Sequence, residues 1–159
     1  MRYAVLFVCM GNICRSPTAE GVFRHLVREA GLQERIKVDS AGTHGYHVGS
    51  PPDERSQHHA SRRGYDLSDL RARQVQFVDF ERFDLILAMD HDNLALLHDD
   101  CPPSQLHKVR RLMEFAPPEL GEVVADPYYG DKNGFETVLD HVEAACEGLL
   151  VHVRQHLGA

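Results

Sequence analysis

The chain has 159 residues, of which 43% are hydrophobic and 26% charged, and its formal net charge is −7. These values are ordinary for a globular protein and exclude a disordered or low-complexity chain, so we expect one domain over residues 1–159. The acidic balance provides no global basic field, and we therefore expect neither nucleic acid nor a membrane among the partners.

The cysteines argue for a cytoplasmic protein. Cys9, Cys14, Cys101 and Cys146 are irregularly spaced, which does not suggest the disulfide framework of a secreted protein. The apolar run at 3–8 is too short for a membrane span, and no small-residue cleavage site follows it.

The first predicted elements are a strand over residues 3–8 and a helix that directly follows a short loop. Ser16 is the expected N-cap of this helix and Pro17 its first residue. Apolar residues then recur with a period of 3.6 until Gly31, which is expected to end the helix.

Strands and helices alternate along the rest of the chain. We predict a strand at 36–40, a loop at 41–52, a helix at 53–63 and a strand at 83–89. A short helix capped by Asp90 and a weak strand at 109–112 follow. An irregular connection at 117–134 then leads to a last helix, which is capped by Asn133 and closed by Gly158. Apolar strands in such an alternation predict a parallel sheet with helices on both faces. Ligands of such sheets bind beyond the carboxyl ends of the strands.

Residues 9–16, Cys-Met-Gly-Asn-Ile-Cys-Arg-Ser, leave the first strand at its carboxyl end. Gly11 and Asn12 tolerate the positive φ of a tightly curled loop, whose backbone N–H groups can surround phosphate oxygens. Arg15 is suited to clamp two phosphoryl oxygens. The loop, the helix N-terminus, Arg15 and the Ser16 hydroxyl would all favour the thiolate of Cys9.

Each residue also has a plainer explanation: Cys9 as a buried thiol, Arg15 as a surface charge and Ser16 as a helix start. Their combination in this setting favours a phosphate-handling active site. The expected phosphate-binding residues are those of the loop and the helix start: Met10, Gly11, Asn12, Ile13, Cys14 and Ser16.

The chain resembles the low-molecular-weight protein tyrosine phosphatases. The resemblance rests on motifs in order along nearly the whole chain, at residues 8–20, 38–43, 45–46, 51–53, 72–74, 89–90 and 126–130. It implies a four-stranded parallel sheet in the order 2-1-3-4 and hydrolysis of phosphotyrosine in proteins, with inorganic phosphate as product. It also implies that Cys9 is the nucleophile, that Arg15 clamps the phosphate and that Asp126 is the general acid and base.

Several further residues are expected to tune this site. Ser40 leaves the second strand beside the loop and is a predicted partner of Asn12, although plain turn chemistry is nearly as good an explanation. Tyr46, Tyr128 and Tyr129 are expected to line the pocket, although Tyr46 and Tyr129 could equally be ordinary exposed tyrosines. Cys14 is either a redox partner that forms a disulfide with Cys9 or a small structural side chain.

The eleven histidines do not indicate a metal site. His152 and His156 have a ligand-capable spacing of four, but histidines near a helix C-terminus are favoured by the helix dipole alone. We expect no metal and no cofactor, because a guanidinium and loop N–H groups supply the positive charge. The sequence has no signal for an oligomeric state.

Three other functions remain open on the same loop. An arsenate reductase needs additional cysteines in a relay, and the chain offers only Cys101 and Cys146. An arginine phosphatase is disfavoured by the apolar Ile13, where related arginine phosphatases have Thr. A non-catalytic phosphate-binding module would not need a nucleophile, a clamp and an acid together.

Overall fold

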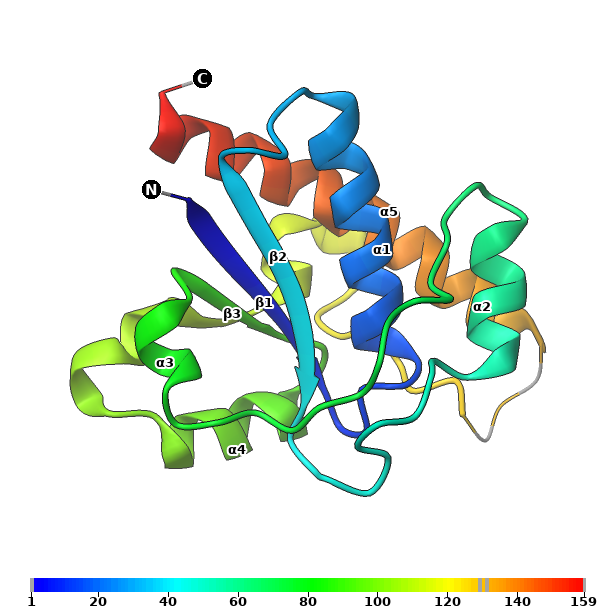
Figure 1. The fold of residues 1–159 in the computed structure, drawn as a ribbon, viewed down its shortest axis with the longest axis horizontal. Coiled ribbons are helices and arrows are strands. Elements are labelled where there is room, and N and C mark those ends of the chain that lie inside the picture. The colour runs from blue at the N-terminus through cyan, green and yellow to red at the C-terminus, as the bar shows by residue number, and fades with distance from the viewer. Residues whose placement is uncertain (1, 129, 131, 159) are drawn as a thin grey trace.

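A single four-stranded parallel sheet in the order β2-β1-β3-β4 forms the centre of the molecule, as expected (Figure 1). The computed structural model describes residues 2–128, 130 and 132–158. The strands are β1 (Tyr3–Cys9), β2 (Ile36–Gly42), β3 (Leu85–Ala88) and β4 (Val109–Arg111). The helices are α1 (Arg15–Glu29), α2 (Glu54–Ser61), α3 (Asp79–Arg82), α4 (His91–Asp100) and α5 (Lys132–Leu157).

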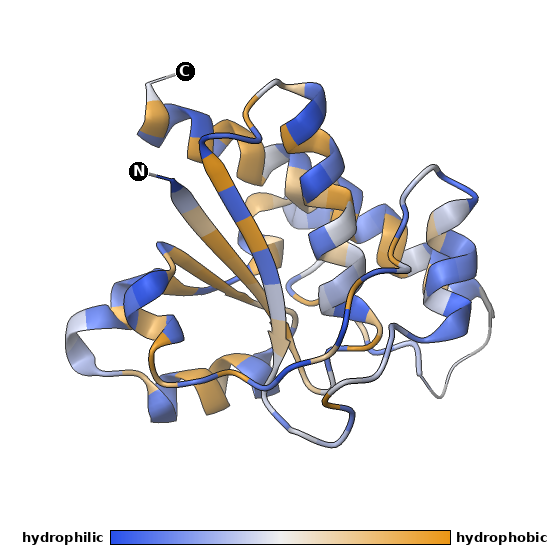
Figure 2. Cartoon of the chain, viewed as in Figure 1, coloured by the Kyte–Doolittle hydropathy of each residue, from blue (hydrophilic) through white to orange (hydrophobic). Residues whose placement is uncertain are grey.

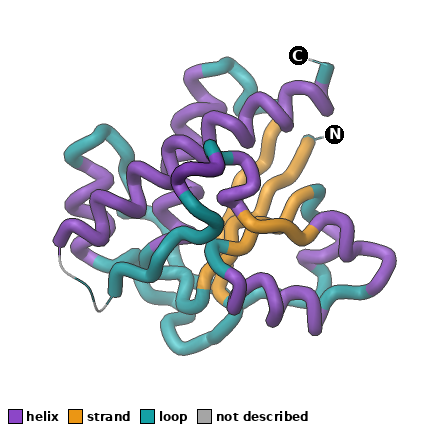
Figure 3. Tube along the Cα trace, turned by 180° about the vertical axis from the view of Figure 1, so that it is seen from behind, coloured by secondary structure: helices purple, strands orange, loops and turns teal. Residues whose placement is uncertain are grey.

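The sheet is buried on both faces, and β1 shows why its sequence is apolar throughout. Val5 and Phe7 belong to the larger core cluster, together with apolar residues of α1 and α5. Ala4, Leu6 and Val8 alternate with them and belong to a second cluster with residues of α3 and α4. A strand between two helical layers needs apolar residues at every position, not at every second one. Figure 2 shows β1 and β3 as mainly hydrophobic, and Figure 3 shows the sheet between helices from behind.

The start of the first helix differs from the prediction. Cys14 occupies the N-cap position without a side-chain cap, and Ser16 lies inside α1. The expectation that Ser16 caps this helix is therefore wrong, because its hydroxyl hydrogen-bonds toward the Cys9 sulfur instead. The predicted end is confirmed, since α1 stops at Glu29 and Gly31 has a φ of 71°.

The other boundaries are close to those expected, with a few corrections. Asp90 caps α4 by accepting the N–H of Asn93, as predicted. Asn133 does not cap the last helix, because α5 begins at Lys132. The second strand continues to Gly42, and α3 was not foreseen because four residues carry too little periodicity.

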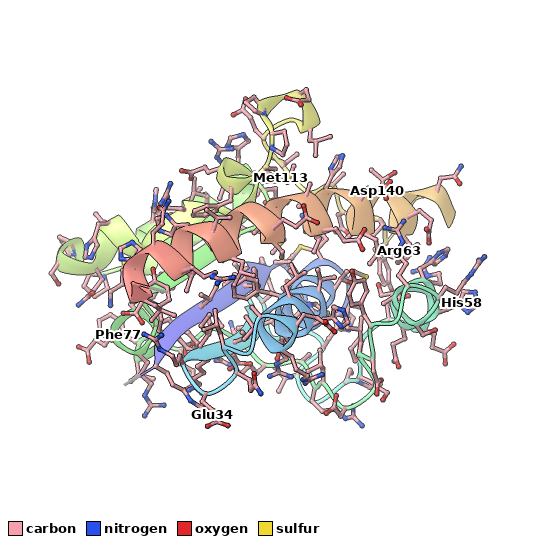
Figure 4. All side chains as sticks on the ribbon, turned by 90° about the horizontal axis from the view of Figure 1, so that it is seen from above. Glu34, His58, Arg63, Phe77, Met113 and Asp140 are labelled. Carbon is pink, nitrogen blue, oxygen red and sulfur yellow. The ribbon has the colours of Figure 1, made fainter. Side chains whose placement is uncertain are left out.

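Helix α2 is fastened to α5 by charged side chains (Figure 4). Arg63, just after α2, forms ion pairs with three acidic residues of α5, namely Glu136, Asp140 and Glu143.

In the part of the chain that is described, no helix combines the length and the apolarity that a membrane crossing requires.

Candidate active site

The loop from residue 10 to 14 curls at the carboxyl end of β1, where neighbouring backbone holds it. The N–H of Thr43 donates to the carbonyl of Cys9 at 2.9 Å, and the N–H of His44 donates to that of Met10 at 3.0 Å. Asn12 has a φ of 59°, and it is the one described residue other than glycine with a positive φ. The expected left-handed turn is therefore present.

Gly42, at the end of β2, lets the loop lie against the sheet. A Cβ at this position would be 2.8 Å from the carbonyl oxygen of Met10 and 3.1 Å from that of His44. Both atoms belong to backbone and cannot move away easily. Any larger residue would therefore push the loop out of place.

The Cys9 sulfur lies at the base of this loop, and the residue is 3% exposed. The N–H of Asn12 donates to the sulfur at 3.3 Å, and the Ser16 hydroxyl oxygen is 3.0 Å from it. The N-terminus of α1 is six residues further along the chain. Polar groups of the loop and of α1 and the positive end of a helix dipole are thus close to the sulfur.

Asn12 connects the loop to two serines behind it. Its amide nitrogen donates to the Ser16 hydroxyl at 2.8 Å and to the Ser40 hydroxyl at 2.9 Å. Its amide oxygen accepts the backbone N–H of Arg73 at 3.0 Å. The predicted pair of Asn12 and Ser40 is therefore present, and these polar groups hold the loop from inside the protein.

Arg15 is 3% exposed and is held by groups from three segments. Its Nη1 donates to Asp90 at 2.6 Å and to the carbonyl of Val124 at 3.0 Å, and its Nη2 lies 3.7 Å from Asp126. Burial alone would lower the pKa of Arg15, but Cys9 and the hydrogen bond to Asp90 outweigh it and raise the pKa. The guanidinium is thus a fixed positive charge.

Asp126 also lines the pocket and lies in the irregular connection before α5. Its side chain is 38% exposed, and its Oδ1 accepts the N–H of Tyr128 at 3.1 Å. The Arg55 guanidinium of α2 lies over the Tyr128 ring at 5.3 Å and over the Phe135 ring at 4.8 Å. Arg55 is itself held by Asp53, through Nη2 at 2.9 Å.

These groups surround one pocket. Its lining residues are Cys9, Met10, Gly11, Ile13, Cys14, Arg15, His47, Asp126 and Tyr128. Asn12 and Ser16, also expected at the phosphate, are not part of the lining and support the loop from behind.

One of the expected aromatic residues lies outside the lining of the pocket. Tyr46 is 78% exposed and stacks on His44 with ring centroids 5.3 Å apart, so it lies outside the pocket, contrary to expectation. His47, one residue later, lines the pocket in its place. Tyr129 lies outside the described residues.

Cys14 lines the pocket but differs from Cys9 in its surroundings. Burial, with a further contribution from Asp53, raises the pKa of Cys14 to about 12, although a hydrogen bond with Ser56 lowers it. Cys14 is therefore a neutral thiol at physiological pH, and both Cys9 and Cys14 are reduced.

Several site residues were missed by the sequence analysis. Asp90 was expected only as a helix cap, yet its other carboxylate oxygen holds Arg15. Arg55 and His47 had no local signal, because their roles depend on segments brought together by the fold. Glu20 was not singled out, although it lies in the motif at residues 8–20. It follows Ser16 by four residues, so the two residues lie one helical turn apart on α1.

Metal ligands do not gather in the described parts of the molecule. Within them, His, Cys, Asp and Glu form no group of three or more that could hold an ion. His152 and His156 instead pack against each other, with ring centroids 4.8 Å apart.

The fold and the pocket define a class of protein: a parallel α/β protein in which a buried cysteine and a buried arginine line one pocket at the carboxyl end of β1. The family model for low molecular weight phosphotyrosine protein phosphatase matches residues 4–158. The chain belongs to this family, and it is thus a hydrolase of phosphomonoesters.

Individual relatives agree with this assignment. The chain is 46% identical to the low molecular weight protein-tyrosine-phosphatase of Streptomyces coelicolor over 160 residues, covering 99% of this chain and 97% of that one. A crystal structure of a protein tyrosine phosphatase from Entamoeba histolytica has a TM-score of 0.94 and 40% identity, covering 97% and 98%. A Drosophila arginine phosphatase is also similar, with a TM-score of 0.87 and 35% identity, covering 97% and 98%.

Proposed function

We propose that this protein hydrolyses phosphotyrosine in proteins through a cysteinyl-phosphate intermediate, and that residues 1–159 form one phosphatase domain. The observation that supports it best is the shared pocket of Cys9, Arg15 and Asp126. The free thiols of the four cysteines support a cytoplasmic location.

In the first step, the Cys9 sulfur attacks phosphorus in line with the tyrosyl oxygen. A sulfur–phosphorus bond forms, the phosphorus–oxygen bond breaks, and Asp126 gives its proton to the departing tyrosyl oxygen. This proton matters because a phenol has a pKa of about 10, so that an unprotonated phenolate leaves less easily.

In the second step, Asp126 takes a proton from water, and the water oxygen attacks phosphorus. The sulfur–phosphorus bond breaks, Cys9 leaves as thiolate, and inorganic phosphate is released. Arg15 and the loop N–H groups stabilise the charge on the phosphoryl oxygens in both steps. Asp126 is partly exposed, which gives water access to the acid.

The pocket walls suit an aromatic ester. Ile13 and Tyr128 line it, and the apolar Ile13 offers no hydrogen bond to a guanidinium, which disfavours an arginine phosphatase. An arsenate reductase is disfavoured because neither Cys101 nor Cys146 lines the pocket, and Cys146 is fully buried in the core.

Hydrolysis of p-nitrophenyl phosphate and of a phosphotyrosine peptide tests the proposal. We expect Cys9→Ser to lower kcat by at least about 10³-fold. We expect Asp126→Asn to lower kcat by about 10²-fold, with the largest loss for poor leaving groups. Cys101→Ser is the matched thiol control and should keep wild-type activity.

Other outcomes would identify a different function. Turnover of phosphoarginine in preference to phosphotyrosine would favour an arginine phosphatase, and thiol-dependent reduction of arsenate would favour a reductase. Binding of the phosphopeptide without any turnover would favour a phosphate-binding module.

A further inference from the structure

The first turn of helix α2 contacts two residues that line the pocket. The backbone N–H of Asp53, which caps this helix, donates to the carbonyl of Ile13 at 2.8 Å. The Asp53 carboxylate also holds Arg55, whose guanidinium lies 5.3 Å from the centre of the Tyr128 ring. Ile13 and Tyr128 both belong to the pocket lining. The position of this turn therefore affects the space between an apolar and an aromatic lining residue.

Phe135 of α5 supports this turn from the interior. The residue is 3% exposed, and the centre of its ring is 4.8 Å from the Arg55 guanidinium. His59 follows Arg55 by four residues, so both side chains lie on one face of α2. The His59 imidazole is parallel to the Phe135 ring within 5°, with ring centroids 5.7 Å apart. One buried ring thus contacts both side chains of this face.

Glu136 fixes the orientation of the His59 ring. Hydrogen bonds from Arg63 and then from His59 lower the pKa of Glu136, so its side chain is a carboxylate that can only accept. The His59 Nδ1 contacts this carboxylate, and it is therefore the ring nitrogen that carries hydrogen. Arg63, which lies beside α5 in Figure 4, holds the same carboxylate at 2.8 Å. The imidazole is thus anchored to α5.

We propose that Phe135 and His59 are positioning residues for aryl phosphates: they hold Arg55, and through it the Tyr128 ring against which the aromatic group of the substrate binds. This proposal rests on the proposed activity toward phosphotyrosine. Neither Phe135 nor His59 is in the pocket lining, so both act through Arg55. A phosphorus ligand without a ring contacts only the phosphate-binding loop, and its affinity should not depend on either residue.

Phe135→Leu tests the proposal, because it removes the ring and keeps an apolar side chain. We expect the Kd for phenylphosphonate, measured by isothermal titration calorimetry, to rise about two- to fivefold, which corresponds to the loss of one cation–π contact. The Kd for methylphosphonate should stay at the wild-type value. His59→Ala should raise the Kd for phenylphosphonate about twofold, since it removes one ring contact with Phe135. His98→Ala, which removes an exposed imidazole from α4, is the control and should change neither Kd.

A double variant shows whether the effect passes through Arg55. In Arg55→Ala the cation that Phe135 supports is absent, so adding Phe135→Leu should cause no further rise in the Kd for phenylphosphonate. A residue that only stabilises the fold would have the same effect with and without Arg55.

An unchanged Kd for phenylphosphonate in a folded Phe135→Leu protein would overturn the proposal. Equal rises for both phosphonates, or rises that multiply in the double variant, would overturn it as well. If Phe135→Leu does not fold, His59→Ala decides by the same titrations, and a wild-type Kd for phenylphosphonate then overturns the proposal. Binding needs no turnover, so this result is independent of the test of the proposed function by Cys9→Ser.

Discussion

The two sides of the pocket are built differently. On the nucleophile side, Cys9, Asn12 and Arg15 are each 3% exposed, and polar groups of the protein satisfy them. On the acid side, the Asp126 side chain is 38% exposed and that of Arg55 is 46% exposed. The nucleophile is thus fixed by buried hydrogen bonds and charge, whereas the acid lies where water can reach it.

This difference in exposure matches the chemical role that we propose for each side of the pocket. Charge on the phosphoryl group must be stabilised without rearrangement at the moment of reaction, which requires donors that are already in place. The acid must give a proton to one molecule and take one from another, which requires access to solvent. We therefore expect substitutions on the buried side to have larger effects on kcat than substitutions on the exposed side.

Arg15→Lys tests the buried side and is expected to have the largest effect on kcat. Lys keeps the positive charge but cannot reproduce the planar fork that Arg15 would present to two phosphoryl oxygens while it contacts Asp90 and Val124. We expect kcat for p-nitrophenyl phosphate to fall by roughly 10²–10³-fold. Arg62→Lys, on the surface at the end of α2, is the control. Near-normal kcat in Arg15→Lys would mean that charge alone suffices.

Arg55→Ala tests the exposed side and should have a smaller effect. It removes the contacts of the guanidinium with the Tyr128 and Phe135 rings, each worth about 0.5–1 kcal/mol at an exposed site. We expect KM for aryl phosphates to rise about three- to tenfold while kcat changes little. Steady-state kinetics on an aryl and an alkyl phosphate would show this. An equal rise for both substrates would contradict a role of the Tyr128 wall.

The smallest expected effect concerns stability and pH. Because the pKa of Glu20 is raised to about 7 in the folded protein, the folded state holds a proton that the unfolded state loses near pH 4.5. This contribution is fully present below about pH 4.5 and is lost as the pH rises through about 7. Urea midpoints from pH 5 to 8 should fall less steeply in Glu20→Gln than in wild type, whereas Glu29→Gln should follow wild type.

Local signals were sufficient to predict the alternating strands and helices of a parallel sheet and the loop at the centre of the site, whereas the strand order was an implication of the family resemblance. The apolar strands, the helical periods of α1 and α5 and the glycines after them depend on neighbours in the chain, and the structure confirms them. The order of Cys9, Asn12 and Arg15 in one loop also predicts their proximity, because a short loop cannot separate them. The two predicted caps that failed, Ser16 and Asn133, show the limit of local rules. Ser16 has a better partner in space than the helix end.

Tertiary structure alone decided what surrounds that loop. Asp90 and Val124 contact Arg15 across 75 and 109 residues of sequence, and Arg73 contacts Asn12 across 61. Tyr46 and His47 are neighbours in the chain, yet only His47 lines the pocket. Periodicity and motifs report interactions between residues close in sequence. The direction of a buried hydrogen bond depends on which distant donors and acceptors the packed sheet and helices bring together.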